Sequence, residues 1–184
     1  METICRCRWC NLRNPLYVAY HDREWGVPQH DDGKLFELLV LESFQAGLSW
    51  ETILNKREAF RAAFGGFIPE RVAACGEAET AALLENRDIV RNRRKIAAAV
   101  QNAKVFLEIQ REWGSFSRYV WHFTDGQVVH ETGMASSPLS NRVSADLKKR
   151  GMTFVGTTIV YAYLQAIGVI DSHDPGCFLH KGAD

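Results

Sequence analysis

The sequence lacks an apolar run long enough to span a membrane, because Glu, Lys or Gly interrupts the longest candidates. Residues 1–7 also lack the apolar core of a secretory signal peptide. Together these absences predict a cytoplasmic protein that does not engage a membrane. The net charge is zero, with 22 basic and 22 acidic residues, which argues against a strongly basic, non-specific nucleic-acid coat. A local basic face remains compatible with this balance.

No Pro/Gly/Ser-rich linker and no internal repeat divides the 184 residues, so we expect one domain spanning residues 1–184. With 46% apolar and 24% charged residues, the composition is that of an ordinary globular protein. Five cysteines without a secretory signal predict reduced thiols, and their clustering near the chain ends favours metal binding over disulfides.

Apolar periodicity and capping residues predict an all-α protein. Residues 1–31 read as an irregular, aromatic-rich arm, and residues 128–130 as a possible short strand. Helices are expected near residues 33–46, 50–64, 69–75, 77–86, 92–112, 115–122, 140–150 and 157–167.

Glu42 lies in the middle of an apolar helix face. Asp32 is the expected N-cap of this helix and Gly47 its stop. Glu37 points the other way, where a solvated carboxylate is expected. Because a buried unpaired charge is costly, Glu42 should have a dedicated partner or an unusual pKa. At helical spacing, one stripe contains Leu35, Leu38, Leu39, Glu42 and Ala46.

Five aromatic residues surround this helix in the sequence: Trp9, Tyr17, Tyr20, Trp25 and Trp50. One acceptor together with several flat π-faces suits a flat, electron-poor or cationic ligand.

A second constellation joins the two ends of the chain. His173 and Cys177 flank a Pro-Gly turn and can chelate one cation. His21 and one N-terminal cysteine (Cys5, Cys7 or Cys10) would complete a closed tetrahedral set, the signature of structural zinc. Three other histidines, His122, His130 and His180, are more simply interpreted as surface or satisfied side chains.

A third constellation is the basic segment of residues 148–158, where one helix ends at Gly151 and another begins after Gly156. Free N–H groups at the start of the second helix, with Thr157 and Thr158, form an anion site that suits a DNA phosphate. A plain tight turn between core helices explains the pattern equally well.

The turn at residues 47–49 leaves Leu48 at a loop tip, where an apolar side chain can wedge between bases. A core-capping role is the simpler interpretation of Leu48. The cluster Arg87, Arg91, Arg93, Arg94 and Lys95 reads first as a solvated helix surface.

Taken together, these segments resemble the 3-methyladenine DNA glycosylase I family, bacterial enzymes that remove alkylated adenine from DNA. The most specific matches are Tyr-His-Asp-x-Glu-Trp-Gly-Val-Pro and Gln-Ala-Gly-Leu-Ser-Trp. The matching stretches span nearly the whole chain in order: residues 7–9, 15–28, 42–50, 91–102, 149–158 and 173–177.

The resemblance implies a helix-hairpin-helix DNA glycosylase fold, with residues 140–168 as the helix-hairpin-helix. It also implies a zinc-clipped lobe that joins residues 1–31 to residues 169–184. One structural Zn²⁺ per chain would be held by the ligand set Cys7, His21, His173 and Cys177.

The resemblance further implies a monomeric, monofunctional enzyme without lyase activity. Its substrate would be double-stranded DNA containing 3-methyladenine, and its products the free base and an abasic site. The implied catalytic residue is Glu42. The implied base-binding residues are Tyr20, Trp50, Tyr17 and Trp9. The implied DNA-binding residues are Gln45, Gly47, Leu48, Gly151, Gly156, Thr157 and Thr158.

Asp171 and Asp174 follow the hairpin where related glycosylases place a sugar-stabilising Asp, and we interpret both as turn or supporting residues. Three rival functions remain open. A non-catalytic reader of damaged DNA would share the same pocket and grip. A zinc hydrolase would need an open coordination position. A small-molecule enzyme for a planar cation would leave the phosphate-binding hairpin without a use.

Overall fold

The structure, a computed structural model, describes residues 4–181 of the chain. This part is mostly helical, with two short strands and two 3-10 turns. The helices are α1 (Pro15–Arg23), α2 (Asp32–Gln45), α3 (Trp50–Asn55), α4 (Arg57–Ala63), α5 (Pro69–Ala73), α6 (Glu77–Glu85), α7 (Arg93–Trp113), α8 (Phe116–Trp121), α9 (Pro138–Lys149) and α10 (Thr157–Ala166). The remaining elements are η1 (Gly65–Phe67), η2 (His122–Thr124), β1 (Val129–His130) and β2 (Ile170–Asp171).

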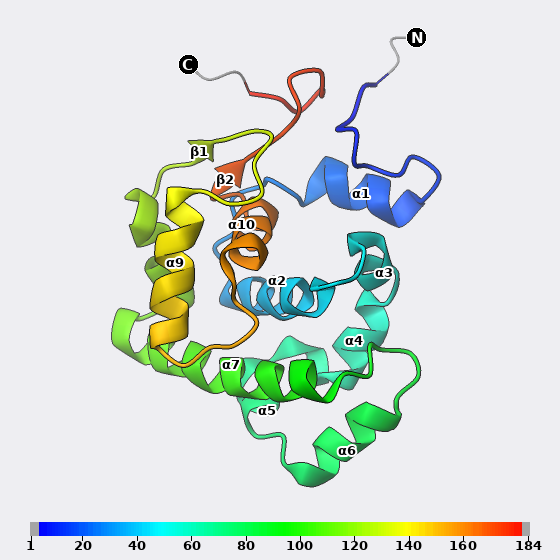
Figure 1. The fold of residues 1–184 in the computed structure, drawn as a ribbon, viewed down its shortest axis with the longest axis vertical. Helices are drawn as coiled ribbons and strands as arrows, with labels where there is room; N and C mark the ends of the chain where they lie inside the picture. Colours follow the sequence, from blue (N-terminus) through cyan, green and yellow to red (C-terminus); the bar gives the residue numbers. More distant parts are fainter. Residues whose placement is uncertain (1–3, 182–184) are drawn as a thin grey trace.

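Helix α2 forms the centre of the molecule. It contacts α10 on one side and α7 and α8 on others, and every residue from Leu35 to Phe44 is buried (Figure 1). A helix that is apolar nearly all round belongs in a core, which explains why α2 needs so many neighbours. The arm that contains α1 and the tail after β2 lie at the same end of the molecule (Figure 1).

Two expectations about the first third of the chain are wrong. The arm is not irregular throughout, because Asn14 caps α1 by accepting a hydrogen bond from the Leu16 N–H. The helix expected over residues 50–64 is two helices, since Lys56 ends α3 and begins α4 with a non-helical backbone.

The N-cap of α2 is Asp31, which accepts a hydrogen bond from the Lys34 N–H at 2.9 Å, and not Asp32 as expected. Asp32 instead accepts hydrogen bonds from the backbone N–H groups of Phe116 and Ser117, both at 2.8 Å. Its carboxylate therefore pairs with the free N–H groups at the start of α8. The two segments are more than eighty residues apart, so the local sequence does not reveal this pairing.

The expectation that Glu37 is solvated is also wrong. Its side chain is 8% exposed and accepts hydrogen bonds from Arg57 Nε at 2.6 Å and from Arg61. Arg57 in turn holds both carboxylate oxygens of Glu24, at 2.7 and 2.6 Å. Burial alone would lower the pKa of Arg57, but these carboxylates outweigh it and raise that pKa.

The short strand expected near residues 128–130 is confirmed. β1 pairs with β2 in parallel, with Val129 opposite Ile170 and His130 opposite Asp171. This pairing ties the segment before α9 to the tail that follows α10. None of the described helices is both long enough and apolar enough to cross a membrane.

Helices α9 and α10 are joined by a turn whose backbone carbonyls are fixed by three buried side chains. Asn102 donates to the Thr153 carbonyl at 2.9 Å, Ser43 to that of Phe154 at 3.1 Å, and Ser144 to that of Val155 at 2.7 Å. Gly151 starts the turn with φ of +100°, a region that glycine enters at little cost. The turn is therefore held rigidly against α2 and α7.

Candidate functional site

A pocket of about 290 Å³ lies between the arm, α2, α10 and the tail. Its walls come from segments far apart in the sequence, which the fold brings together at one place. The lining residues are Trp9, Tyr17, Tyr20, Trp25, Glu42, Gln45, Trp50, Gly133, Met134, Ala162, Gln165, Ser172 and Asp174.

Glu42 is the charged group in the most buried part of this lining. It is 4% exposed, and its Oε2 has no hydrogen-bond partner among residues 4–181. Burial raises the pKa of Glu42 to about 8. The sequence predicted a dedicated partner or an unusual pKa, and the structure shows the second alternative.

Aromatic rings enclose the space in front of Glu42. The rings of Tyr20 and Trp50 lie 5.1 Å apart, and those of Trp9 and Tyr17 lie 5.5 Å apart. Burial raises the pKa of Tyr17 to about 12 and that of Tyr20 well above its usual range, so both phenols stay protonated donors. The Trp50 Nε1 is a further buried donor without a partner among the described residues. These groups offer a planar ligand π-faces, N–H and O–H donors, and one acceptor.

The resemblance did not assign several of the lining residues. Trp25 was noted among the five aromatics, and its position beside Trp9 (4.7 Å between rings) was not foreseen. Gly133 and Met134 belong to an exposed loop without helical or strand periodicity, so no sequence signal marked them. Asp174 lines the pocket, whereas Asp171 is turned toward His173 and His130.

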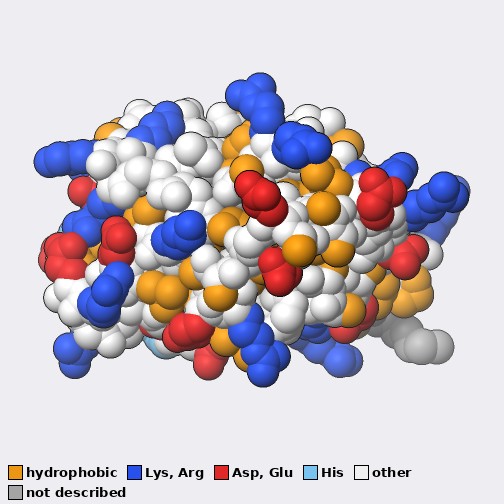
Figure 2. Space-filling view, turned by 90° about the horizontal axis from the view of Figure 1, so that it is seen from below, with side chains coloured by type: hydrophobic (Ala, Val, Ile, Leu, Met, Phe, Trp, Pro, Cys, Tyr) orange, Lys and Arg blue, Asp and Glu red, His pale blue; other side chains and the backbone are white. Residues whose placement is uncertain are grey.

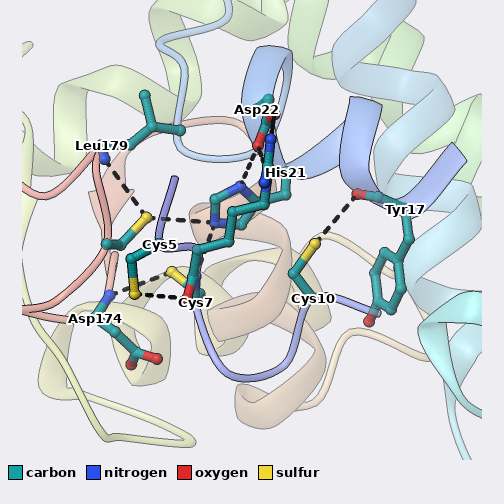
Figure 3. Close-up of polar contacts among 10 residues, drawn as sticks. Cys5, Cys7, Cys10, Tyr17, His21, Asp22, Asp174 and Leu179 are labelled. Atoms are coloured by element: carbon teal, nitrogen blue, oxygen red, sulfur yellow. Dashed lines mark hydrogen bonds and ion pairs between the residues drawn. The ribbon is translucent and has the colours of Figure 1, made fainter. Parts of the chain in front are cut away.

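Beside the pocket lies a candidate metal centre. Ligand atoms of Cys7, His21 and Cys177 all lie within 4.8 Å of one another, and all three residues are buried (Figure 3). The structure thereby selects Cys7 from the three N-terminal cysteines. Cys5 is exposed, and the Cys10 thiol donates to the Tyr17 carbonyl instead.

His173 is not part of that group of three, but it faces the same place. Its ring lies 5.6 Å from that of His21, and its buried Nε2 has no partner within residues 4–181. Both imidazoles donate from Nδ1 to a carboxylate, His21 to Asp22 at 2.8 Å and His173 to Asp171 at 2.7 Å. Each Nδ1 is thereby occupied by a carboxylate, as in carboxylate–histidine–zinc sites. The Nε2 of His21 lies 3.5 Å from the Cys177 Sγ and accepts a hydrogen bond from the Cys7 N–H at 3.2 Å.

The donor set fits a zinc ion. Two thiols and two neutral imidazoles are ligands that Zn²⁺ takes in closed tetrahedral sites. Burial lowers the pKa of His21 and so favours the neutral ring that a metal requires, and burial raises the pKa of the Cys7 thiol to about 12. Only a nearby cation would compensate a thiolate at that depth.

The candidate metal centre is in direct contact with the pocket walls. The Trp9 ring packs on His21 at 5.2 Å, and the Trp25 ring packs edge-on to His173 at 4.8 Å. Gly26 makes room for this packing, because a Cβ there would lie 2.7 Å from the His173 ring. Two tryptophans of the pocket wall therefore pack against two candidate metal ligands.

The turn after α2 lies at the edge of the pocket. Gln45 lines the pocket, and Gly47 has φ of +77° with nothing within 4 Å of the position that a Cβ would occupy. Leu48 is 41% exposed. The core-capping interpretation of Leu48 is therefore wrong, and its side chain is free to meet a ligand.

In the hairpin between α9 and α10, Gly156 has open space in front of it and Thr158 is exposed. The Thr157 hydroxyl is already engaged with Asn141 at 2.6 Å and Ser140 at 2.8 Å. Gly151 is exposed at the start of the turn. The backbone at the start of α10 is thus accessible, while one of the two threonine hydroxyls is committed to the protein.

The basic clusters are only partly available to a ligand. Lys95 is 7% exposed and donates to the Phe44 and Ala46 carbonyls at the end of α2. Arg150 is paired with Glu112 and Asp146. On the face drawn in Figure 2, basic and acidic side chains are interspersed and form no single basic patch.

Comparison with known proteins gives consistent results. The family model described as methyladenine glycosylase matches residues 9–180. DNA-3-methyladenine glycosylase 1 of Escherichia coli (strain K12) is 44% identical, covering 96% of this chain and 97% of that protein. The DNA-3-methyladenine glycosylase of Haemophilus influenzae is 39% identical, covering 94% and 96%.

Solved structures agree on the fold. A crystal structure of 3-methyladenine DNA glycosylase I superimposes with a TM-score of 0.92 at 46% identity, covering 96% of this chain and 100% of that one. A second structure addresses 3-methyladenine recognition by the Staphylococcus aureus 3-methyladenine DNA glycosylase I. It gives a TM-score of 0.91 at 34% identity, covering 98% and 100%.

Proposed function

The chain belongs to the methyladenine glycosylase family, and from that premise we propose that it is a DNA-3-methyladenine glycosylase acting in base-excision repair. It hydrolyses the N-glycosidic bond of 3-methyladenine in alkylated double-stranded DNA. The products are the free base and an abasic site. The observation that carries the proposal is Glu42, a buried carboxylate that forms no ion pair within residues 4–181, at the back of an aromatic pocket.

Recognition follows from the charge of the damaged base. The target nucleotide is flipped out of the duplex so that its base enters the pocket. A 3-methyladenine in DNA is cationic, whereas adenine is neutral. With a pKa of about 8, Glu42 is mostly protonated at neutral pH, and a cation beside it favours the ionised form. The cationic damaged base therefore offsets the free-energy cost of burying an ionised Glu42, whereas neutral adenine does not.

The aromatic walls add to this selection. The rings of Trp50, Tyr17 and Trp9 provide π-faces, and a cation on such a face gains about 1–2 kcal/mol when desolvated. Tyr20, whose phenol stays protonated, supplies a hydrogen-bond donor beside Glu42. The pocket thus holds the base by charge, stacking and hydrogen bonds at once.

The chemical step needs little acid assistance. The bond from C1′ to the base breaks, and its electron pair neutralises the positive charge of the leaving 3-methyladenine. Water attacks C1′ and gives up a proton, which leaves the abasic site. No lysine is found among the described residues that line the pocket, so no amine is placed to form a Schiff base. This supports a monofunctional enzyme without lyase activity.

The DNA backbone is gripped by the helix-hairpin-helix of residues 140–168. Gly151 and Gly156 shape the turn. The free backbone N–H groups at the start of α10, those of Thr157 and Thr158 among them, bind a phosphate together with the exposed Thr158 hydroxyl. The exposed Leu48, carried by Gly47 next to Gln45, fills the space that the flipped base leaves. We assign all of this to a single domain that acts as a monomer.

Cys7, His21, His173 and Cys177 would hold one Zn²⁺ as a structural ion. When bound, the ion supplies no reaction chemistry and only cross-links the arm to the tail. Because Trp9 and Trp25 pack on the two histidine ligands, the cross-link also fixes two pocket walls.

Metal analysis of purified variants tests the zinc site. His173→Ala should lose the bound zinc, while His180→Ala, a histidine on the same tail outside the ligand set, should retain one ion per chain. Equal zinc content in the two variants would remove His173 from the site.

The function itself is tested by release of 3-methyladenine from methylated duplex DNA. Wild-type protein should release the base. Glu42→Gln should release it at least about a hundredfold more slowly, because a neutral amide cannot offset the charge of a cation. The control is Glu37→Gln, the same substitution on the same helix but away from the pocket, which should keep its rate per folded molecule. Binding of methylated DNA by wild type without base release would instead favour a non-catalytic reader.

A further inference from the structure

One wall of the pocket comes from the loop between β1 and α9. This loop crosses α10 and reaches toward α1 (Figure 1), and its residues Gly133 and Met134 line the pocket. The remaining walls are helices, the N-terminal arm and the C-terminal tail. The loop is thus the one irregular segment from the middle of the chain that contributes to the lining.

The loop is fixed at both ends and unbonded between them. Glu131 donates its N–H to the Asp171 carbonyl at 3.2 Å, and the Ser172 hydroxyl donates to the Glu131 carbonyl. At the other end, Ser137 and Ser140 form a capping box at the start of α9. Residues 132–136 make no hydrogen bond to any other described residue. The middle of the loop can therefore adjust without breaking a bond of the fold.

Met134 is the large side chain that this loop offers to the pocket. It lines the pocket yet is 46% exposed, whereas the tryptophan Trp50 on another wall is 8% exposed. A thioether is apolar and polarisable, and three rotatable bonds let it follow the shape of its partner. Met134 is an exposed, adaptable apolar side chain at the edge of the cavity. It loses its contact with water, and gains the free energy of apolar burial, only when a base is bound.

Resting on the proposed function, we propose that Met134 is a specificity-determining residue that closes the pocket over the flipped base. Its thioether covers the apolar part of the methylated base and excludes water from the cation beside Glu42. The contact raises the attraction between that cation and the carboxylate, because the effective dielectric falls when water leaves. Gly133, with φ of +72° and nothing within 4 Å of the position that a Cβ would occupy, lets the loop present Met134 in this way.

Oxidative footprinting tests the contact on the wild-type protein. Dilute hydrogen peroxide transfers one oxygen atom to a thioether, which gives a sulfoxide and water. Met134 should oxidise several-fold more slowly when free 3-methyladenine saturates the pocket. Met152, which is 3% exposed and outside the pocket, is the internal control and should oxidise slowly with or without the base. An unchanged Met134 rate at saturating base overturns the proposal.

Substitution tests the role in specificity. Met134→Ala should weaken binding of free 3-methyladenine about tenfold and lower the preference for 3-methyladenine over adenine in binding, while Met134→Leu should restore most of both. Ile68→Ala, an exposed apolar residue remote from the pocket, is the matched control. Equal affinity and preference in Met134→Ala and wild type overturn this inference alone. Failure of wild type to release 3-methyladenine overturns the proposed function.

Discussion

Glu37 and Glu42 lie on the same helix and are almost equally buried, with 6% and 4% of their surfaces exposed. Their surroundings are opposite. Glu37 meets Arg57 at 2.6 Å and Arg61 at 2.8 Å, and Arg57 also binds Glu24. Glu42 meets aromatic rings and a cavity, and one of its oxygens has no partner in the described chain.

The difference shows that burial alone does not distinguish a structural carboxylate from a functional one. A buried charge with excellent partners is retained for the fold, and removing one partner leaves the other uncompensated. A buried carboxylate without partners is a cost to the fold that only a ligand can offset. The same substitution at the two positions should therefore have opposite effects on stability.

The largest effect is expected at Glu37. Glu37→Gln removes the charge that faces two guanidinium groups, so the free energy of unfolding should fall by about 3 kcal/mol. Denaturant unfolding at neutral pH measures it. Glu58→Gln is the control, because Glu58 binds Arg61 in the same network but is 80% exposed and should cost little. Equal losses in the two variants would mean that burial does not strengthen the Glu37 contacts.

Glu42→Gln should have the opposite sign and be stabilising by about 2 kcal/mol near pH 6. The folded pKa of Glu42, about 8, lies above its ordinary value of 4.5. Between these two values the unfolded chain has lost the proton that the folded chain retains, so wild type loses stability as pH rises through that window. Below it, the two proteins should converge.

Unfolding curves of wild type and Glu42→Gln at several pH values measure this difference. A gap that stays constant from acid to alkaline pH would show that Glu42 ionises normally in the folded protein. A gap that grows with pH while excision is lost would identify Glu42 as a group kept for function at the expense of stability.

This contrast also shows what sequence reasoning can reach. The helical fold, the burial of Glu42 and the aromatic residues around it were predicted, because periodicity and the spacing of residues in one segment carry that information. The residues themselves suggested His21, His173 and Cys177, and family resemblance chose Cys7 among the N-terminal cysteines. The geometry of three of these four metal-ligand candidates agrees with the assignment.

What the sequence could not reveal depends on pairing across the fold. Glu37 was misread as solvated because its partners, Arg57 and Arg61, lie about twenty residues away on another helix. Lys95 was placed on a basic surface, yet it caps α2 from about fifty residues away. Met134 stood in a loop with no periodicity at all. In each case the local sequence pattern did not indicate the environment of the side chain, which tertiary contacts determine.

A smaller effect, about tenfold, is expected in the pH dependence of catalysis. The ratio kcat/KM reports ionisation of the free enzyme, and the methylated base in DNA has a fixed charge. Because ionised Glu42 offsets that charge, kcat/KM should rise about tenfold per pH unit below the Glu42 pKa of about 8 and level off above it. Glu42→Gln should show no such rise. A wild-type profile that is level below about pH 8 and falls above it would mean that Glu42 acts in its protonated form.

The smallest effect is expected at Arg61, the more exposed partner of Glu37. Arg61 is 40% exposed and Arg57 only 12%, so water screens the first contact much more than the second. Arg61→Ala should therefore lower the free energy of unfolding by less than about 1 kcal/mol, because Arg57 still holds the Glu37 carboxylate. The measurement is the same denaturant unfolding used for Glu37→Gln. If Arg61→Ala costs as much as Glu37→Gln, Glu37 depends on both guanidinium groups together, and its stability role rests on the network and not on the buried Arg57 contact.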